Sequence, residues 1–350
     1  SSRRRHTRYA DRSRGLGDVY KRQVLEFPVP DTNSVQVSIV IPVYNQYRTS
    51  ISCLQSILAH TEGRSYEVII ADDCSTDLTG SIESRVTGVR VVRGEQNMGF
   101  LRNCNHAVRA ARGSYVVLLN NDTNVQASWL QPLIDVLESD PKVGLVGPKL
   151  LFEDGKLQEA GGIIWQDGSG WNYGRRKNSE LPEFNYLRET DYVSGACFLI
   201  RKSTWDDLDG FDEAFIPAYY EDTDLAFQVR KRGLKVVYQP ESVVVHFEGV
   251  SNGTDLSRGI KTHQASNQQK FVQKWQDVLI RDHFPNAENI FQARDRSREK
   301  KVVVLIDHYV PFYDKDAGSR STYIYVKAMI EAGLVVKFCP ANFFPHQPYT

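Results

Sequence analysis

The sequence contains no long uninterrupted run of apolar residues. A membrane-spanning helix needs about 20 consecutive apolar residues, and no segment approaches that length. Cysteine is also scarce, with five residues in 350 and no CxxC spacing among them. These absences predict a protein without a membrane-spanning helix. They also favour reduced thiols in the cytoplasm over a disulfide framework.

Two glycine-rich phosphate-binding patterns are missing as well. No GxGxxG motif follows a predicted strand, which argues against a dehydrogenase. Residues 42–46, after the first predicted strand, read Pro-Val-Tyr-Asn-Gln and form no glycine-rich loop. This argues against a nucleotidyltransferase, which stays an alternative because it too would be an α/β protein with a metal ion.

Residues 1–23 are basic and aperiodic, and they lack the apolar segment of a signal peptide. Residues 13–23 resemble a translated transposon-derived sequencing adapter, and residues 2–8 resemble a translated flow-cell primer. We therefore interpret residues 1–23 as a non-native tail. The alternative is a basic arm that binds nucleic acid or a membrane.

Leaving out this tail changes the charge of the protein. Of the 43 Lys/Arg and 43 Asp/Glu residues in the chain, eight and two lie in residues 1–23, so the remainder carries a net charge of −6. Nucleic-acid-binding domains are usually basic. We therefore expect no nucleic-acid partner.

From residue 35 onward, strand and helix patterns alternate. We expect strands over residues 37–42, 66–71, 89–92 and 115–119, and helices over residues 47–60, 77–86 and 99–111. Gly113 would end the last of these helices. Strands that alternate with helices of this length predict an α/β fold with a mostly parallel, Rossmann-like sheet flanked by helices.

The second half of the chain is less regular. Residues 153–192 are rich in Gly, Trp, Tyr and charge, and further strands are expected over residues 194–201, 236–238 and 243–246. Residues 286–300 are polar and predict a linker. Residues 301–350 restart the rhythm with one βαβ unit, too little to bury its own core. The predicted organisation is a domain over residues 35–285, a linker over 286–300 and a domain fragment over 301–350.

Acidic and amide side chains cluster at or after three segments: Asp72-Asp73, Asn120-Asn121-Asp122 and Glu221-Asp222. Carboxylates at the carboxyl ends of buried strands are well placed to hold a ligand at the edge of a sheet. The alternatives are helix capping for the first segment, an Asx turn for the second and favourable helix N-terminal charges for the third.

The second segment suits a metal ion. Asn120 and Asp122 would lie on the same side of an extended chain. Their oxygen atoms are ligands that Mg²⁺ or Mn²⁺ prefers when a diphosphate supplies the others. His246 ends a predicted strand and is either a third ligand or a structural histidine. In the third segment, one acid can serve as a general base for an acceptor hydroxyl.

These motifs together resemble family 2 glycosyltransferases of the GT-A fold. The segments that carry the resemblance are 37–45, 72–77, 97–100 with Asn105, 118–123, 194–196, 210–213 and 221–225, in order over roughly residues 35–250. The resemblance implies an inverting transferase that uses a nucleotide sugar and a divalent cation, Mg²⁺ or Mn²⁺. The alternative is a non-catalytic nucleotide-sugar- or glycan-binding module, which would not need three acidic sites on one edge.

The resemblance also implies roles for individual residues. Asp72 would contact the base, Asp122 would bind the metal, and Asp222 would be the general base, with Glu221 as its nearest competitor. The other residues that it places at the nucleotide sugar are Pro42, Tyr44, Asn45, Asp73, Asn97, Gly99, Asn105, Asn120, Asn121 and Gly195.

Asn120 is a departure, because the family's metal motif often has Asp there. A neutral amide is a weaker ligand, so Asn120 could instead bind only the sugar. Relatives that act on bacterial surface polysaccharides share this Asn. We therefore expect a UDP- or dTDP-sugar donor, a glycan or lipid-linked acceptor, and a cytoplasmic location compatible with peripheral contact at the inner membrane.

Two further expectations concern other segments. Residues 301–350, with 316–320 reading Asp-Ala-Gly-Ser-Arg, resemble the opening βαβ unit of a family 4 glycosyltransferase of the GT-B fold. Residues 163–192 carry Trp165, Trp171, Tyr173 and Tyr186. Aromatic stacking by these residues would shape the acceptor site, whereas ordinary surface packing is the alternative.

Overall fold

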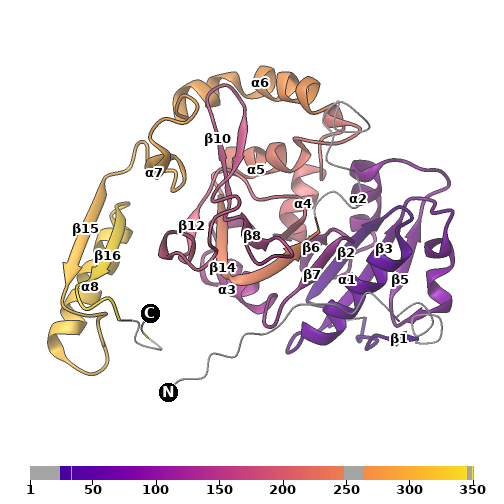
Figure 1. Ribbon diagram of the computed structural model, residues 1–350, viewed down its shortest axis with the longest axis horizontal. Helices are drawn as coiled ribbons and strands as arrows, with labels where there is room; N and C mark the ends of the chain where they lie inside the picture. The colour runs from indigo at the N-terminus through magenta and orange to yellow at the C-terminus, as the bar shows by residue number, and fades with distance from the viewer. Residues whose placement is uncertain (1–23, 33, 248–262, 345–348, 350) are drawn as a thin grey trace.

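The computed structural model describes residues 24–32, 34–247, 263–344 and 349 (Figure 1). The predicted tail, residues 1–23, lies outside them. A ten-stranded sheet forms the centre of the molecule. Its order is β12 (Arg188–Glu189), β14 (Lys235–His246), β8 (Val143–Leu151), β13 (Cys197–Arg201), β6 (Tyr115–Leu119), β2 (Val37–Val43), β3 (Tyr66–Asp72) and β5 (Arg90–Arg93), with β7 (Thr123–Val125) beside β14 and β9 (Leu157–Glu159) beside β8.

Most of the strands run in one direction. β2 is parallel to β3 and β6, β3 is parallel to β5, and β8 is parallel to β14. β13 lies antiparallel between β6 and β8, so these two neighbours share the common direction. The mostly parallel α/β fold predicted from the alternating pattern is confirmed.

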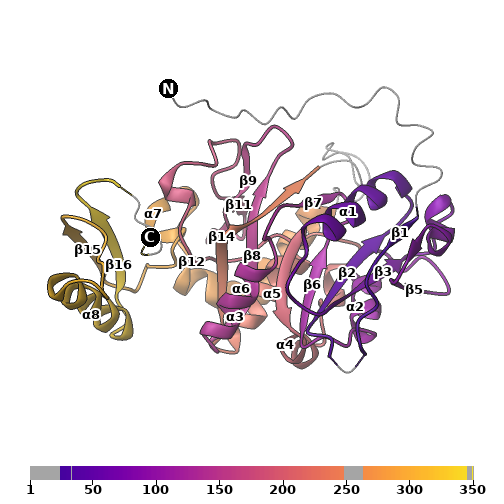
Figure 2. The ribbon, with the colours of Figure 1, turned by 90° about the horizontal axis from the view of Figure 1, so that it is seen from below.

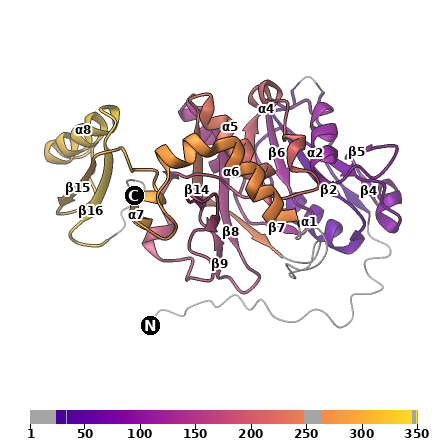
Figure 3. The same cartoon turned by 90° about the horizontal axis from the view of Figure 1, so that it is seen from above.

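Helices cover both faces of the sheet (Figures 2 and 3). One face packs against α1 (Tyr47–His60) and α3 (Gln131–Ser139), and the other packs against α2 (Phe100–Arg109), α4 (Lys202–Leu208), α5 (Glu221–Lys231) and α6 (His263–Asp282). In β6, Val117 and Leu119 face the first core, whereas Val116 and Leu118 face the second. Strands buried on both faces explain the continuous apolar runs.

Several predicted elements have different bounds in the structure. The helix expected over residues 77–86 is a short 3₁₀ segment, η1 (Leu78–Ser84), whose N-cap Asp77 accepts a hydrogen bond from the Thr79 N–H. The strands expected over 236–238 and 243–246 are one strand, β14, with an irregularity between Gln239 and Val243. The strand expected from residue 194 begins at Cys197, because the preceding residues turn to contact two carboxylates.

Smaller elements surround the sheet. β1 (Leu25–Glu26) pairs with β4 (Val86–Thr87), and β10 (Gly162–Ile164) pairs with β11 (Gly170–Asn172) as a hairpin. The remaining 3₁₀ segments are η2 (Pro182–Phe184) and η3 (Glu213–Phe215). Leu25 and Phe27 are buried. The packed structure therefore includes residues before position 35, where the predicted domain begins.

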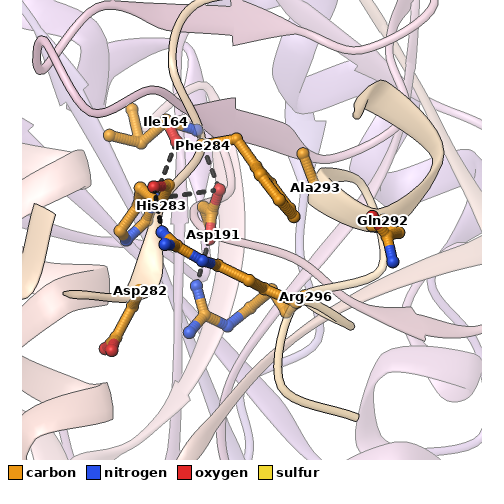
Figure 4. A pocket seen from close by; sticks show the side chains of 9 residues that line it. Ile164, Asp191, Asp282, His283, Phe284, Gln292, Ala293 and Arg296 are labelled. Atoms are coloured by element: carbon orange, nitrogen blue, oxygen red, sulfur yellow. Dashed lines mark hydrogen bonds and ion pairs between the residues drawn. The ribbon is translucent and has the colours of Figure 1, made fainter. Parts of the chain in front are cut away.

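Residues 286–300, expected as a linker, are packed against the rest of the protein. They contain α7 (Ile290–Ala293) and the buried residue Ala293. Arg296 reaches the buried carboxylate of Asp191, and His283 lies 3.6 Å from the same group (Figure 4). Burial lowers the pKa of His283 to about 4. The ion pair between Arg296 and Asp191 in this small buried pocket attaches residues 286–300 to the rest of the protein.

Residues 302–340 form the βαβ unit β15 (Val302–Asp307), α8 (Ala317–Glu331) and β16 (Val335–Pro340), at the edge of the molecule beyond β12 (Figure 1). Apolar side chains of β15, including Val304 and Ile306, are exposed. Lys337 of β16 donates to the Asp295 carboxylate at 2.5 Å, which connects the unit to the packed segment. Among the described residues, no helix combines the length and hydrophobicity needed to cross a bilayer.

Gly113 does not end α2 as a left-handed cap, because the helix already ends at Arg109. Instead it lies against β2, where a Cβ atom would be 2.6 Å from the Ser38 backbone nitrogen. We predict that Gly113→Ala lowers the free energy of unfolding by about 1–3 kcal/mol through overpacking. Urea denaturation would measure it, with the exposed neighbour Ser114→Ala as the matched control. Equal stability of the two variants would contradict the prediction.

Candidate active site

The predicted site residues gather at one edge of the sheet. β2, β3 and β6 are parallel, so residues 43–45, 72–73 and 120–122 follow strand ends at the same edge. β13 runs in the opposite direction, so the turn before it, 194–196, lies at this edge too. The Asn120 N–H donates to the Ala196 carbonyl at 2.9 Å, which joins the two segments.

Asp72 ends β3 and is completely buried. Its carboxylate accepts hydrogen bonds from the Ser75 N–H at 2.9 Å and from Arg93 Nε at 2.7 Å. Arg93 is a residue that the sequence interpretation missed. Arg93 ends β5, which pairs with β3 so that Arg93 lies opposite Asp72. Only the strand order of the sheet reveals this contact.

Asp73 organises the loop before α2. Its carboxylate accepts from the Met98 N–H at 2.6 Å and the Gly99 N–H at 2.9 Å, and the Asn97 side chain donates to the Asp73 carbonyl at 3.2 Å. A carboxylate at this position is favourable with the N-terminus of the helix. The structure therefore brings the predicted residues Asp73, Asn97 and Gly99 together.

Asn45 fastens the neighbouring loop. It has a left-handed backbone, with a φ of 57°, and its side-chain oxygen accepts from the Thr76 N–H at 2.8 Å and the Asp77 N–H at 3.2 Å. Pro42 lies within β2, paired with Ala71. The ring of Tyr44 is 52% exposed and is available for stacking on a flat ligand.

Two residues predicted to bind the ligand form hydrogen bonds within the protein. The Asn105 amide donates to the Phe211 carbonyl at 2.8 Å and accepts from the Phe211 N–H at 2.9 Å. Asn121 is buried and donates to Ser50 Oγ of α1 at 2.9 Å. Both amides have protein partners that hold the surrounding loops.

Asp122 and His246 meet as the metal prediction requires. β7 pairs with β14, which puts Thr123 opposite His246, and His246 Nε2 lies 3.3 Å from Asp122 Oδ1. His246 Nδ1 lies 2.9 Å from the Gln158 side-chain oxygen. The two ring nitrogens of His246 therefore face a side-chain amide and a carboxylate.

A carboxylate oxygen and an imidazole nitrogen are both ligands that divalent cations take, and an outer contact from the other ring nitrogen to a polar side chain is typical of metal-bound histidine. The residues present therefore fit a divalent cation. In the part of the chain that the structure describes, no group of three or more His, Cys, Asp or Glu is placed to hold a metal. Asp122 and His246, with Asn120 nearby in sequence, leave room for ligands from elsewhere, such as a diphosphate.

Asp222 is held by the main chain at the start of α5. Its carboxylate accepts from the Gly195 N–H at 2.8 Å and the Thr223 N–H at 2.6 Å. The residue is half-buried, and this burial raises its pKa. A carboxylate that keeps partial access to solvent and has a raised pKa is suited to accept a proton.

Glu221 differs from its neighbour in its surroundings. It is buried, and within the described residues its Oε2 atom has no hydrogen-bond partner. Burial and the nearby charge of Asp222 raise the pKa of Glu221 to about 8. A buried carboxyl of this kind is mostly protonated at neutral pH, which favours Asp222 over Glu221 as a base.

Glu159 of β9 is a third carboxyl at the site, and sequence reasoning missed it. It is buried and accepts from the Ser194 N–H at 3.0 Å, so the adjacent amides of residues 194 and 195 bind Glu159 and Asp222 respectively. Burial, with a contribution from the charge of Asp222, raises its pKa to about 8. No strand-end motif marks it, because β9 is a strand of only three residues that pairs with the end of β8.

The aromatic residues expected at the acceptor site separate into different environments. Trp165 is buried against Trp171, with ring centroids 4.9 Å apart, and Tyr173 and Tyr186 bond to Glu183 and Asp295. Only Trp171 of the four is exposed. It projects from the opposite face of β11 to Asn172.

Two bonds connect this hairpin to the region around Asp222. The Tyr192 hydroxyl donates to the Asn172 side chain at 3.0 Å, and the Tyr220 hydroxyl donates to the Gly168 carbonyl at 3.0 Å. Tyr192 and Tyr220 both lie close enough to Asp222 for its charge to raise their pKa values further, beyond the effect of burial. The hairpin side that faces Asp222 is therefore the one with Asn172.

Glu159 generates a prediction about pH. Its pKa is near 4.5 when exposed and about 8 when folded, so the folded protein binds more protons in this interval and loses stability as pH rises through it. Glu159→Gln keeps the acceptor for Ser194 and removes the titration. We predict that the variant gains at least about 1.4 kcal/mol of stability relative to wild type between about pH 5 and about pH 8.

Urea denaturation at the two pH values would measure this difference. The matched control is Glu153→Gln, which changes an exposed glutamate. A stability difference between Glu159→Gln and wild type that is the same at both pH values would contradict the prediction.

Comparisons with known proteins agree with this geometry. Residues 38–208 match the family model described as Glycosyl transferase family 2. The chain is 30% identical to the uncharacterized protein y4gI of Sinorhizobium fredii, over 62% of this chain and 25% of that protein. It is 28% identical to the O-antigen biosynthesis protein RfbC of Myxococcus xanthus, over 66% of this chain and 18% of that protein. The chain thus spans a quarter or less of these two relatives.

A third relative is closer in length. The N-acetylglucosaminyl-diphospho-decaprenol L-rhamnosyltransferase of Mycobacterium tuberculosis is 27% identical, over 61% of this chain and 76% of that protein. Among solved structures, the crystal structure of GalNAc-T7 with UDP, GalNAc and Mn²⁺ has a TM-score of 0.55 at 18% identity, over 71% of this chain and 50% of that one. Residues 38–208 are thus similar to glycosyl transferase family 2, and the fold of the chain is the GT-A fold.

Proposed function

We propose that this protein is an inverting glycosyltransferase that moves a sugar from a nucleotide-diphosphate donor to a hydroxyl acceptor. The observation that carries the proposal is the placement of Asp222. Main-chain amides of residues 195 and 223 hold its carboxylate, half-buried, at the sheet edge that also bears Asp122 and His246. A base and a cation site on one edge match the needs of a single displacement at a sugar carbon.

In the proposed step, the acceptor oxygen bonds to the anomeric carbon from the side opposite the leaving group. The bond between that carbon and the phosphate oxygen breaks, and its electron pair leaves with the nucleoside diphosphate. Asp222 takes the proton of the acceptor hydroxyl. Because attack and departure occur on opposite faces, the anomeric configuration inverts.

Asp122 and His246 are the proposed protein ligands of a divalent cation, Mg²⁺ or Mn²⁺, and Asn120 is a proposed neutral ligand or sugar contact. Such a cation would neutralise charge on the departing diphosphate. The distance of 3.3 Å between His246 Nε2 and Asp122 Oδ1 supports this assignment. The presence of UDP and Mn²⁺ in the GalNAc-T7 structure, which has a similar fold, is consistent with it.

The donor is proposed to be a UDP- or dTDP-sugar bound beside Tyr44, Asp72 and the loop held by Asp73. Two relatives named for O-antigen biosynthesis and for transfer to a decaprenol-linked sugar suggest a glycan or lipid-linked acceptor in surface polysaccharide synthesis. A cytoplasmic site at the membrane face would suit such an acceptor. The βαβ unit at residues 302–340 is proposed to open a second, GT-B-like transferase domain.

Asp222→Asn tests the base assignment, because it keeps the shape and removes the basicity. We predict that it lowers turnover by at least ~10²-fold, since general base catalysis typically contributes ~10²–10⁴-fold. Donor affinity should change little. The assay is hydrolysis or transfer with a panel of UDP- and dTDP-sugars and Mn²⁺, with titration calorimetry for affinity.

Glu221→Gln is the matched control in this experiment. Turnover that survives in Asp222→Asn but collapses in Glu221→Gln would move the base by one residue. If the wild-type protein turns over none of the panel, and donor binding survives both substitutions, the protein is a non-catalytic binding module instead.

Asp122→Ala tests the cation site. We predict that it abolishes the increase in donor affinity produced by Mn²⁺, because it removes the charged member of the ligand pair. Asn120→Asp should keep or raise that affinity by adding a charged oxygen. Calorimetry with the same donors, with and without a chelator, measures both effects. Full donor affinity in excess chelator would overturn the metal role.

A further inference from the structure

The chain segment that leads into α5 has an unfavourable backbone. Tyr219 and Tyr220 have φ values of 74° and 73°, in the left-handed region that favours glycine. Such conformations are costly for bulky residues and persist only where surrounding contacts impose them. Glu221 and Asp222 follow directly, so the contacts that hold these two tyrosines also fix the proposed base.

Asn267 of α6 supplies these contacts. Its side-chain nitrogen donates toward three carbonyl oxygens of the segment, those of Phe215 at 2.7 Å, Ala218 at 2.8 Å and Tyr219 at 3.1 Å. Asn267 is 0% exposed, and its Oδ1 atom has no hydrogen-bond partner within the described residues. A buried acceptor without a hydrogen-bond partner is costly. The amide of Asn267 bears this cost because its nitrogen, the donor end, faces the carbonyl oxygens of the segment.

The same helix contacts α5 on the other side of Asp222. Lys274 Nζ lies 2.8 Å from Asp224, and Trp275 Nε1 donates to the same carboxylate at 2.7 Å. Phe271, between Asn267 and Trp275, packs on Tyr220 with ring centroids 5.2 Å apart. Figure 3 shows α6 crossing the molecule close to α5. Residues before and after Asp222 are therefore both fixed by α6.

We infer that α6 braces the proposed base, and that Asn267 is a positioning residue that sets the place of Asp222 by holding the segment 215–220, whose last two residues have a left-handed backbone. The inference rests on the proposed function of Asp222. Asn267 acts through the main chain and needs no contact with a substrate. It lies outside residues 38–208, the part of the chain that matches the family model.

Asn267→Ala tests the inference. We expect turnover to fall by about 10- to 100-fold, because displacements of about 1 Å at a reacting group cost this much. The KM for the donor should stay unchanged, because none of the proposed donor and cation contacts lies on α5 or α6. The assay uses the panel of UDP- and dTDP-sugars with Mn²⁺. Gln269→Ala, at an exposed position of the same helix, is the control and should behave as wild type.

Hydrogen exchange provides a readout that does not depend on activity. In Asn267→Ala, amides of residues 219–224 should exchange faster than in wild type, while those of residues 226–231 at the far end of α5 should be unchanged. A general loss of structure would accelerate both sets. If that happens, Trp275→Phe serves instead, because it removes the donor to Asp224 and leaves a smaller aromatic ring in the core; it should lower turnover, to a lesser degree, with unchanged donor KM.

A double-mutant cycle tests whether the Asn267 contacts offset the backbone strain at Tyr219. Glycine adopts a φ near 74° without steric cost, so Tyr219→Gly removes part of the need for the Asn267 contacts. The turnover loss caused by Asn267→Ala should therefore be smaller in the Tyr219→Gly background than in wild type, by at least about threefold. Equal losses in the two backgrounds would overturn the inference.

The outcomes separate this inference from the proposed function. If Asp222→Asn loses turnover while Asn267→Ala keeps both turnover and exchange rates, the positioning role is wrong and the proposed function stands. If Asp222→Asn keeps full turnover, the proposed function is wrong. Exchange at residues 219–224 then still decides whether Asn267 holds the segment.

Discussion

Carboxylates collected at one edge of a sheet must find hydrogen-bond donors, and in this protein the main chain supplies most of them. Asp73 takes the N–H groups of residues 98 and 99, and Asp222 takes those of residues 195 and 223. Buried acids without such donors would be too costly to keep. The loops at this edge are shaped around that requirement.

The carboxylates at this edge differ in their contact partners, and these partners indicate a different role for each. Asp72 has an arginine and Asp73 has two amides, so both shape loops next to the proposed donor site. Asp122 faces a histidine that is itself fixed by Gln158 of β9. The next residue of β9, Glu159, supports the turn that holds Asp222. One short strand therefore links the proposed cation site to the proposed base, although Asp122 and Asp222 are 100 residues apart in the sequence.

The sequence predicted what local patterns determine. Apolar runs located the strands, and α1 has the predicted bounds of residues 47–60 because its apolar spacing is regular and its N-terminal boundary is clear. His246 was a candidate because it ends a predicted strand, whereas its meeting with Asp122 depends on the pairing of β7 with β14. Asn105 and Asn121 could not be separated from ligand-binding amides, because only tertiary contacts show that Phe211 and Ser50 occupy them. Glu159 and Asn267 left no local signal for the same reason.

The reversal of β13 has a further consequence. Because this strand runs against its neighbours, its amino-terminal turn presents backbone N–H groups to the edge, and the anchor of Asp222 belongs to the peptide bond of residue 195. A Cβ atom at this glycine would make only ordinary contact, 3.5 Å from the Asp222 side chain. Every amino acid except proline keeps that N–H. The hydrogen bond that holds the proposed base therefore does not depend on the identity of the side chain at position 195, and a methyl group there would fit beside Asp222.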